Sequence, residues 1–210
     1  MARLFSKKVR NKVTRKTKPL ILIIAEGNNV TESQYFNSFQ RQHNDFNIKV
    51  LTPAHITDPT GMQKKILQYW QNKGLDKEQG DIAFIVLDLD SSTNKAQLIR
   101  KLAKRDSAAK FVVSNPCFEV WFLLHFKYST HAYASSTEAV RDLRNYISGY
   151  EKNMQVASVL ANNLETALDN AKKLKIHFDR LETEWPSEAC NPYTDVPVVI
   201  NAIMKYNIEK

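Results

Sequence analysis

The sequence has 210 residues, of which 43% are hydrophobic and 25% are charged, and its formal net charge is +8 at pH 7. This composition predicts a globular protein with one substantial domain and argues against a disordered chain. No apolar stretch is long enough to cross a bilayer, and the N-terminus lacks the apolar segment of a secretory signal, so we expect a cytoplasmic protein without a membrane partner. Cys117 and Cys190 lie far apart and the histidines form no close pair, which argues against a zinc site and favours reduced thiols.

The positive charge is concentrated in residues 1–19, which contain eight basic residues and no acidic one. In the remaining sequence, 22 basic residues balance 22 acidic ones. A basic tail of this kind can bind nucleic-acid phosphates through counterion release, although a solubilising leader would have the same composition. We therefore predict a flexible basic tail over residues 1–19, with candidate nucleic-acid contacts at Arg10, Lys12, Arg15, Lys16 and Lys18.

The next part of the chain alternates between short apolar runs, typical of buried strands, and stretches with helical periodicity. The candidate strands comprise residues 20–25, 46–51, 82–90 and 110–113, and candidate helices begin at Thr31 and cover residues 62–73 and 93–104. A strand–helix alternation predicts an α/β fold with a central parallel sheet of about four strands, right-handed crossovers and helices on both faces.

A strongly apolar helix is predicted after the fourth strand. Asn115 resembles a helix N-cap, and Pro116 would occupy the first helical position. Beyond residue 128, helical periodicity recurs in residues 136–148, 164–181 and 195–206. We therefore divide the chain into a tail (residues 1–19), an α/β core (residues 20–128) and a C-terminal helical extension packed on the core (residues 129–210).

Asp88 and Asp90 directly follow the apolar run that begins at Ile82. Alternate residues of a strand point to the same side, so both carboxylates are expected to leave the strand end together. Two adjacent carboxylates repel each other unless a cation or a proton lies between them. Oxygen ligands favour Mg²⁺ and then Mn²⁺, so this pair is a candidate metal site. The alternative is structural, because Asp is also common in turns and helix caps.

Three glutamates are predicted near the same edge of the sheet. Glu26 follows the first strand, and ligands of open α/β sheets bind outside the carboxyl ends of the strands. Glu32 lies in the first turn of the following helix, and Glu119 lies in the first turn of the apolar helix after residue 115. An acid in a first helical turn also compensates the helix dipole, so this role remains open for both residues.

The sequence resembles the RloB-like family over residues 20–206. The resemblance is carried, in this order along the chain, by Glu26-Gly27, Thr31-Glu32-x-x-Tyr35-Phe36, Asp88-x-Asp90, Ser114-Asn115-Pro116-Cys117-Phe118-Glu119-x-Trp121-x-Leu123-Leu124-His125-Phe126 and Asn191-Pro192-x-Thr194. It implies a Toprim/Rossmann-like core with a Mg²⁺- or Mn²⁺-dependent site that cleaves or transfers phosphodiesters. It further implies an ABC-like ATPase partner and a role in defence against phage.

The same resemblance assigns roles to the acids. Glu26 would act in acid–base chemistry or metal binding, Asp88 and Asp90 would bind metal, and Glu32 would occupy the place of a further acid in related nucleases. The leading hypothesis is therefore a nuclease with catalytic residues Glu26, Asp88 and Asp90, and with a metal held by these three acids and by Glu32 or Glu119. The substrate, RNA or DNA, and association into a homo-oligomer remain open.

Two other functions remain possible from the sequence. Leu89 and Ser91 stand where many family members carry a charged residue, so a non-catalytic Toprim module that binds nucleic acid or the ATPase is one alternative. The other is a haloacid-dehalogenase-like phosphatase, in which an Asp-x-Asp supplies a nucleophile and an acid. That class usually carries the motif on its first strand, and it would leave Glu26 without a role.

Overall fold

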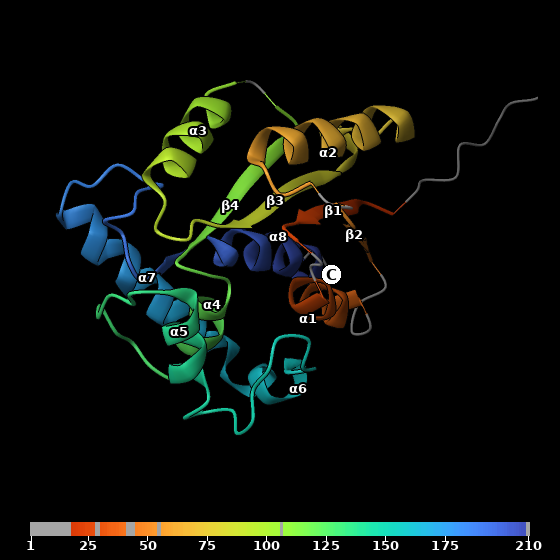
Figure 1. Cartoon of the computed structure of the whole chain (residues 1–210). Coiled ribbons are helices and arrows are strands. Elements are labelled where there is room, and N and C mark those ends of the chain that lie inside the picture. Colours follow the sequence, from red (N-terminus) through yellow and green to blue (C-terminus); the bar gives the residue numbers. More distant parts are fainter. Residues whose placement is uncertain (1–17, 28–29, 41–44, 54–55, 106, 209–210) are drawn as a thin grey trace, which may run out of the picture.

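The fold is built on a five-stranded sheet with the strand order β2-β1-β3-β4-β5; Figure 1 labels its first four strands. The computed structural model describes residues 18–27, 30–40, 45–53, 56–105 and 107–208, so Arg10, Lys12, Arg15 and Lys16 of the predicted tail lie outside the described residues. The strands are β1 (Leu20–Ala25), β2 (Asn47–Leu51), β3 (Ile82–Asp88), β4 (Ala109–Asn115) and β5 (Tyr193–Thr194). The first four strands pair in parallel, as the strand–helix alternation predicts.

The fifth strand corrects the expected count of about four. β5 has two residues and pairs antiparallel with Ser114 and Asn115 at the end of β4. A two-residue strand leaves no apolar run in the sequence. It forms only because its backbone pairs with the end of β4.

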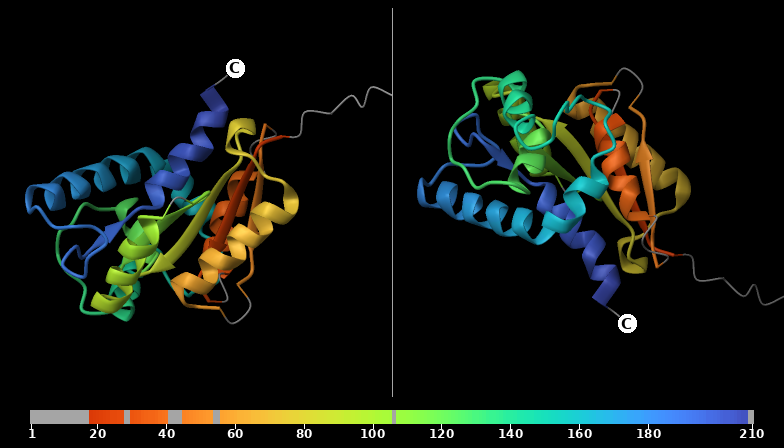
Figure 2. Two further views of the ribbon diagram at one scale, coloured as in Figure 1. Left: turned by 90° about the horizontal axis from the view of Figure 1, so that it is seen from above. Right: turned by 90° about the horizontal axis from the view of Figure 1, so that it is seen from below.

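Helices cover both faces of the sheet, as predicted (Figure 2). Buried side chains of α2 and α3 pack on one face, and those of α1, α4 and α8 pack on the other. The helices are α1 (Val30–Gln40), α2 (Pro59–Lys73), α3 (Thr93–Ala103), α4 (Glu119–Leu124), α5 (Ser136–Leu143), α6 (Ala157–Leu160), α7 (Leu164–Arg180) and α8 (Val196–Ile208). None of the described helices is both long and apolar enough to cross a membrane.

The central strand β3 is buried on both of its faces. Phe84 and Val86 point into the larger apolar cluster, whereas Ala83, Ile85 and Leu87 point into the smaller one. Burying a large apolar side chain contributes about 1.5–3 kcal/mol. This two-sided burial fixes the register of β3 and therefore the place where its carboxyl end emerges.

The C-terminal part of the chain shares the larger core with the sheet. That core includes strand residues from Ile21 onward and helical residues as far as Ile203. Trp121 of α4 is fully buried, and its Nε1 donates a hydrogen bond of 2.8 Å to the hydroxyl of Tyr35 on α1. The helices after residue 128 therefore complete the core that one face of the sheet requires.

Two predicted helix starts differ from the observed ones. Asn115 is not an N-cap, because β4 continues through it to pair with Tyr193, and α4 begins only at Glu119 after a cis Asn115–Pro116 bond. The helix predicted to begin at Thr31 already includes Val30, and the Thr31 hydroxyl accepts the backbone N–H of Asn153.

Candidate functional site

The carboxyl ends of β1 and β3 lie side by side and bring Glu26 to Asp88. The two strands are neighbours, with Ala25 opposite Val86. The backbone N–H of Glu26 donates to Val86, and the Glu26 side chain accepts the N–H of Asp88 at 3.3 Å. The parallel register thus places acids 62 residues apart next to each other.

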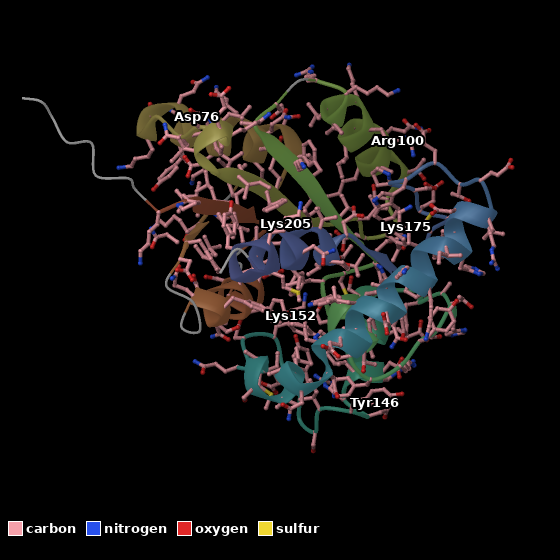
Figure 3. The ribbon with its side chains drawn as sticks, turned by 180° about the vertical axis from the view of Figure 1, so that it is seen from behind. Asp76, Arg100, Tyr146, Lys152, Lys175 and Lys205 are labelled. Atoms are coloured by element: carbon pink, nitrogen blue, oxygen red, sulfur yellow. The ribbon has the colours of Figure 1, made fainter. Side chains whose placement is uncertain are left out.

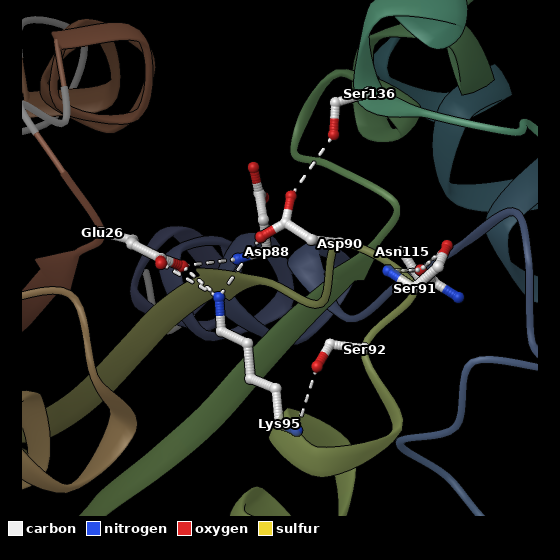
Figure 4. A network of polar contacts seen from close by, with 8 residues as sticks. All are labelled: Glu26, Asp88, Asp90, Ser91, Ser92, Lys95, Asn115 and Ser136. Carbon is white, nitrogen blue, oxygen red and sulfur yellow. Dashed lines mark hydrogen bonds and ion pairs between the residues drawn. The ribbon is translucent and has the colours of Figure 1, made fainter.

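Lys95 bridges Glu26 and Asp90 (Figure 4). Its Nζ lies 3.0 and 2.8 Å from the two carboxylate oxygens of Glu26 and 3.5 Å from Oδ2 of Asp90. The side chain reaches this point from the first turn of α3 and is only 15% exposed. A single ammonium group therefore compensates two of the predicted site acids.

The loop after β3 is held in an unusual backbone conformation. Asp90 and Ser91 have φ angles of 52° and 53°, a left-handed region that side chains other than glycine rarely adopt. The N–H of Asp90 donates to Pro116 at 3.0 Å, and the N–H of Ser91 donates to the side-chain oxygen of Asn115 at 3.1 Å. These bonds to the β4–α4 connection stabilise the loop and fix the position of Asp90.

Asp88 and Glu119 lie on the face of the sheet that α1 and α4 cover. Asp88 shares its strand face with Phe84 and Val86, whose partners include both helices. Glu119 is 2% exposed, and its Oε1 accepts the Tyr150 hydroxyl at 3.2 Å and lies 3.9 Å from Nζ of Lys152. Its Oε2 is buried and has no hydrogen-bond partner among the described residues.

All five predicted ligand acids line one cavity of about 410 Å³. Its wall also contains Lys152 and Asn153, which come from the C-terminal half of the chain. Figure 3 labels Lys152 in the region between α1 and α6. The acids are Glu26, Glu32, Asp88, Asp90 and Glu119.

The electrostatics of this cavity disfavour negative charge on its inner acids. Burial, and then the charges of Glu32, Glu119 and Asp90, raise the pKa of Asp88 well above its ordinary value. Burial, with Glu119 and Glu26, raises the pKa of Glu32 to about 7. Partial burial lowers the pKa of Lys152, but the nearby acids, Glu119 first, raise it more. Asp88 and Glu32 therefore favour their neutral forms more than an ordinary Asp or Glu does, and a bound cation would oppose this effect.

The carboxylate groups of the cavity have the chemistry that a hard cation prefers, but they are not gathered tightly around one point. Within the described part of the chain, no three His, Cys, Asp or Glu side chains lie close enough together to enclose a metal ion. The donors are nevertheless all carboxylates, and one of them presents a buried oxygen without a partner. This donor set fits Mg²⁺ or Mn²⁺. Among the described residues no ion pair is formed by Asp88 or Glu32, and Glu119 has one, to Lys152 at 3.9 Å.

The sequence model of the RloB-like protein family matches residues 21–203. The chain belongs to the RloB-like family. No curated protein and no solved structure gives a match. The family match covers every acid of the cavity in this RloB-like protein, and it stops short of the basic tail.

Lys18 is the only predicted tail contact that lies within the described residues, and it is exposed. It precedes β1, whereas Glu26 follows β1. A six-residue strand separates its two ends by about 20 Å. In this RloB-like protein Lys18 thus lies at the end of the sheet opposite to the acidic cavity.

Three site residues escaped prediction from the sequence. Lys95 carries a detectable signal, because a cation in the first turn of a helix opposes the helix dipole and calls for a compensating partner. Tyr150 and Lys152 carry none, because they lie in a loop whose sequence has no motif and which reaches the acids only through tertiary packing.

Proposed function

We propose that this RloB-like protein is a Mg²⁺- or Mn²⁺-dependent nuclease of the Toprim type that hydrolyses phosphodiester bonds in its acidic cavity. The observation that carries the proposal is the convergence of five acids from four separate segments on one cavity. Acids that raise one another's pKa are unfavourable for stability alone, so their gathering supports a role in function.

The residues divide into a cation-holding group and a proton-transfer group. Asp88, Glu32 and Glu119 would hold the metal, with Asp90 at the exposed rim. A bound divalent cation would supply charge stabilisation to the phosphate and acidify a water molecule. Glu26 would take or give a proton at its carboxylate, and Lys95 holds that carboxylate in place through both oxygens.

Lys152 and the basic tail would bind the substrate. Lys152 is 59% exposed at the cavity wall, where its ammonium group can pair with a phosphate without leaving the neighbourhood of Glu119. The tail, whose described residue Lys18 lies at the other end of the sheet, would bind phosphates further along the nucleic acid and strengthen binding at low salt.

The decisive experiment compares Asp88→Asn with the parent protein on single- and double-stranded RNA and DNA in the presence of Mg²⁺ or Mn²⁺. We expect Asp88→Asn to lower the cleavage rate by at least about a hundredfold, because its carboxylate would be lost from the cation-holding group. Asp169→Asn, an exposed acid on α7, is the matched control and should cleave like the parent. Equal cleavage by Asp88→Asn and the parent would contradict the proposal.

A non-catalytic module is the second candidate, and one observation favours it. The Lys95 ammonium group already lies between Glu26 and Asp90, where it opposes binding of a second cation. This candidate predicts Mn²⁺ binding, measured by calorimetry, without cleavage of any nucleic acid even when the partner protein is present.

The finer family expectations belong to the same proposal. The protein would act in the cytoplasm in defence against phage, together with an ABC-like ATPase. Co-expression with an ATPase encoded beside it, followed by size-exclusion chromatography with light scattering, tests this association and also reveals a homo-oligomer.

A further inference from the structure

The outer edge of β4 is open along most of its length. β5 pairs only with Ser114 and Asn115, and among the described residues no strand pairs with residues 109–112 on that side. Asp195 covers the edge at Val113, where it accepts the Val113 N–H through Oδ2 at 3.3 Å and donates its own N–H to the Val113 carbonyl at 2.9 Å. The paired part of the edge therefore ends at Val113.

The direction of the free backbone groups follows from strand geometry. Residues two apart in a strand turn their N–H and C=O groups to the same side, so Phe111 directs both groups away from β3, as Val113 does. Ala109 points the same way, but its N–H donates to the Ser107 hydroxyl at 3.1 Å. The open edge thus offers one donor and two acceptors, in the spacing that an additional strand requires.

A cavity of about 600 Å³ lies along this edge and is distinct from the acidic site. Its far wall is formed by Trp185 and Pro186, and a hydrogen bond of 2.5 Å from Arg100 to the Pro186 carbonyl holds that wall in place. The two cavities share no described lining residue, and Figure 3 labels Arg100 and Lys152 well apart. The volume falls within the range of about 300–1,000 Å³ for ligand-binding sites.

The charge of the lining selects the ligand. Three exposed basic residues line the cavity, Lys104, Arg105 and Lys110, and the only acid among its described lining residues is Asp195. The Asp195 carboxylate is already used, because it accepts the Val113 N–H and the Trp185 Nε1–H at 2.6 Å. The cavity therefore combines an unpaired strand edge, an aromatic wall and positive charge.

We infer that this edge binds an extended acidic peptide of a partner protein, which adds a strand beside β4. Phe111 pairs with the peptide backbone, Trp185 contacts one of its apolar side chains, and Lys104, Arg105 and Lys110 pair with its carboxylates. Four or five peptide residues, each spanning about 3.3 Å, match the open edge.

Three other occupants fit less well. The basic residues 1–17 of this chain would be repelled by the lining. A second copy paired through its own β4 would place Lys110 near the partner copy's basic residues, and like charges across a strand pair are destabilising. Nucleic-acid phosphates carry only acceptors and cannot bond the free carbonyls of Ala109 and Phe111.

The test uses the full chain and a display library of random peptides of about seven residues, long enough to cover the open edge at about 3.3 Å per residue. We expect the selected peptides to be acidic and rich in β-branched residues. On binding, hydrogen exchange of the Phe111 amide should slow markedly while that of Val112, which faces β3, stays unchanged. No selection of acidic peptides, or an unchanged Phe111 amide on binding, would overturn the inference.

Charge reversal separates this edge from the rest of the surface. Arg105→Glu/Lys110→Glu should weaken binding of the selected peptide at least about tenfold, because the favourable charge pairs become repulsive. Lys64→Glu/Lys172→Glu, at exposed positions on α2 and α7, is the matched control and should bind like the parent. Equal weakening in both variants, a concentration-dependent dimer that excludes the peptide, or competition by a single-stranded oligonucleotide would each contradict the inference.

Discussion

Lys95 forms ion pairs with two carboxylates, those of Glu26 and Asp90, and its ammonium group is largely shielded from water. Its side chain is 15% exposed, and the Glu26 side chain is 24% exposed. Charge-assisted hydrogen bonds in such surroundings are stronger than those at the surface. The residue therefore has both a structural effect and an electrostatic effect on Glu26.

We predict that Lys95→Gln lowers the free energy of unfolding by about 1–3 kcal/mol, because Glu26 loses its charged donor. The measurement is urea unfolding at neutral pH without divalent cations. Lys175→Gln, which breaks an ion pair whose two members are 60% exposed, is the control. That change should stay below about 0.5 kcal/mol, and equal effects of the two substitutions would contradict the assignment.

Glu32 gives the cavity a pH dependence. The pKa of its carboxyl lies at about 7 in the folded protein and at 4.5 as the ordinary value. Between these values the folded state keeps a proton that the unfolded chain releases, so the contribution of Glu32 to stability is present below pH 4.5 and is lost as the pH rises through 7. The raised pKa of Asp88 acts in the same direction.

We therefore expect Glu32→Gln to be more stable than the parent at pH 8, and to lose this advantage as the pH falls toward 4.5. The difference in unfolding free energy between variant and parent, measured by urea unfolding across this range without metal, is the quantity to follow. Glu165→Gln, at an exposed position on α7, should show no such pH-dependent difference. A pH-independent difference for Glu32→Gln would show that its carboxyl is not perturbed.

At the scale of elements, the loop between α5 and α6 closes the acidic cavity. Tyr150 donates to Glu119, and Asn153 donates through its N–H to Thr31. The loop thereby connects the first turns of α4 and α1, the two helices that carry Glu119 and Glu32. These two hydrogen bonds therefore help to set the distance between Glu119 and Glu32.

Tyr150→Phe tests this connection. The substitution leaves both oxygens of a buried carboxylate without a hydroxyl donor and should lower the unfolding free energy by about 1–3 kcal/mol. Tyr146→Phe, at a position 40% exposed, should change it by less than about 0.5 kcal/mol. A Tyr150→Phe protein as stable as the parent would show that the hydroxyl of Tyr150 does not stabilise Glu119.

At the scale of the whole molecule, the two parts of the chain form one core. The larger apolar cluster draws residues from β1 through α8, and β5 supplies the last strand of the sheet. An α/β core that ended near residue 128 would expose the α4 helix, whose six residues are all buried. The sequence pattern changes near residue 128, but the residues before and after this point share one hydrophobic core.

We predict that a fragment of residues 18–128 does not fold by itself, because one face of its sheet would lack α8 and α4 would lack α5 and α7. Amide proton dispersion in nuclear magnetic resonance spectra, compared with that of residues 18–208, measures this. A fragment with dispersed amide signals and a cooperative thermal transition would show that the core is autonomous.

The sequence by itself determined the parallel sheet, its helical layers and the acids at the strand ends. Strands that are buried on both faces appear in the sequence as continuous apolar runs, and the acids follow these runs directly. It also placed Glu26, Glu32, Asp88, Asp90 and Glu119 near one edge, since the carboxyl ends of parallel strands emerge together. These properties depend on local pattern and on the handedness of the crossovers.

Only the tertiary structure decided the rest. Asn115 became a strand residue instead of a helix cap because Tyr193, 78 residues later, pairs with it. Lys95, Tyr150 and Lys152 joined the acids for the same reason: packing brought their segments to the cavity. Contacts between residues distant in sequence leave no periodic trace in the chain, because their energy arises only when the separate elements have assembled around a common core.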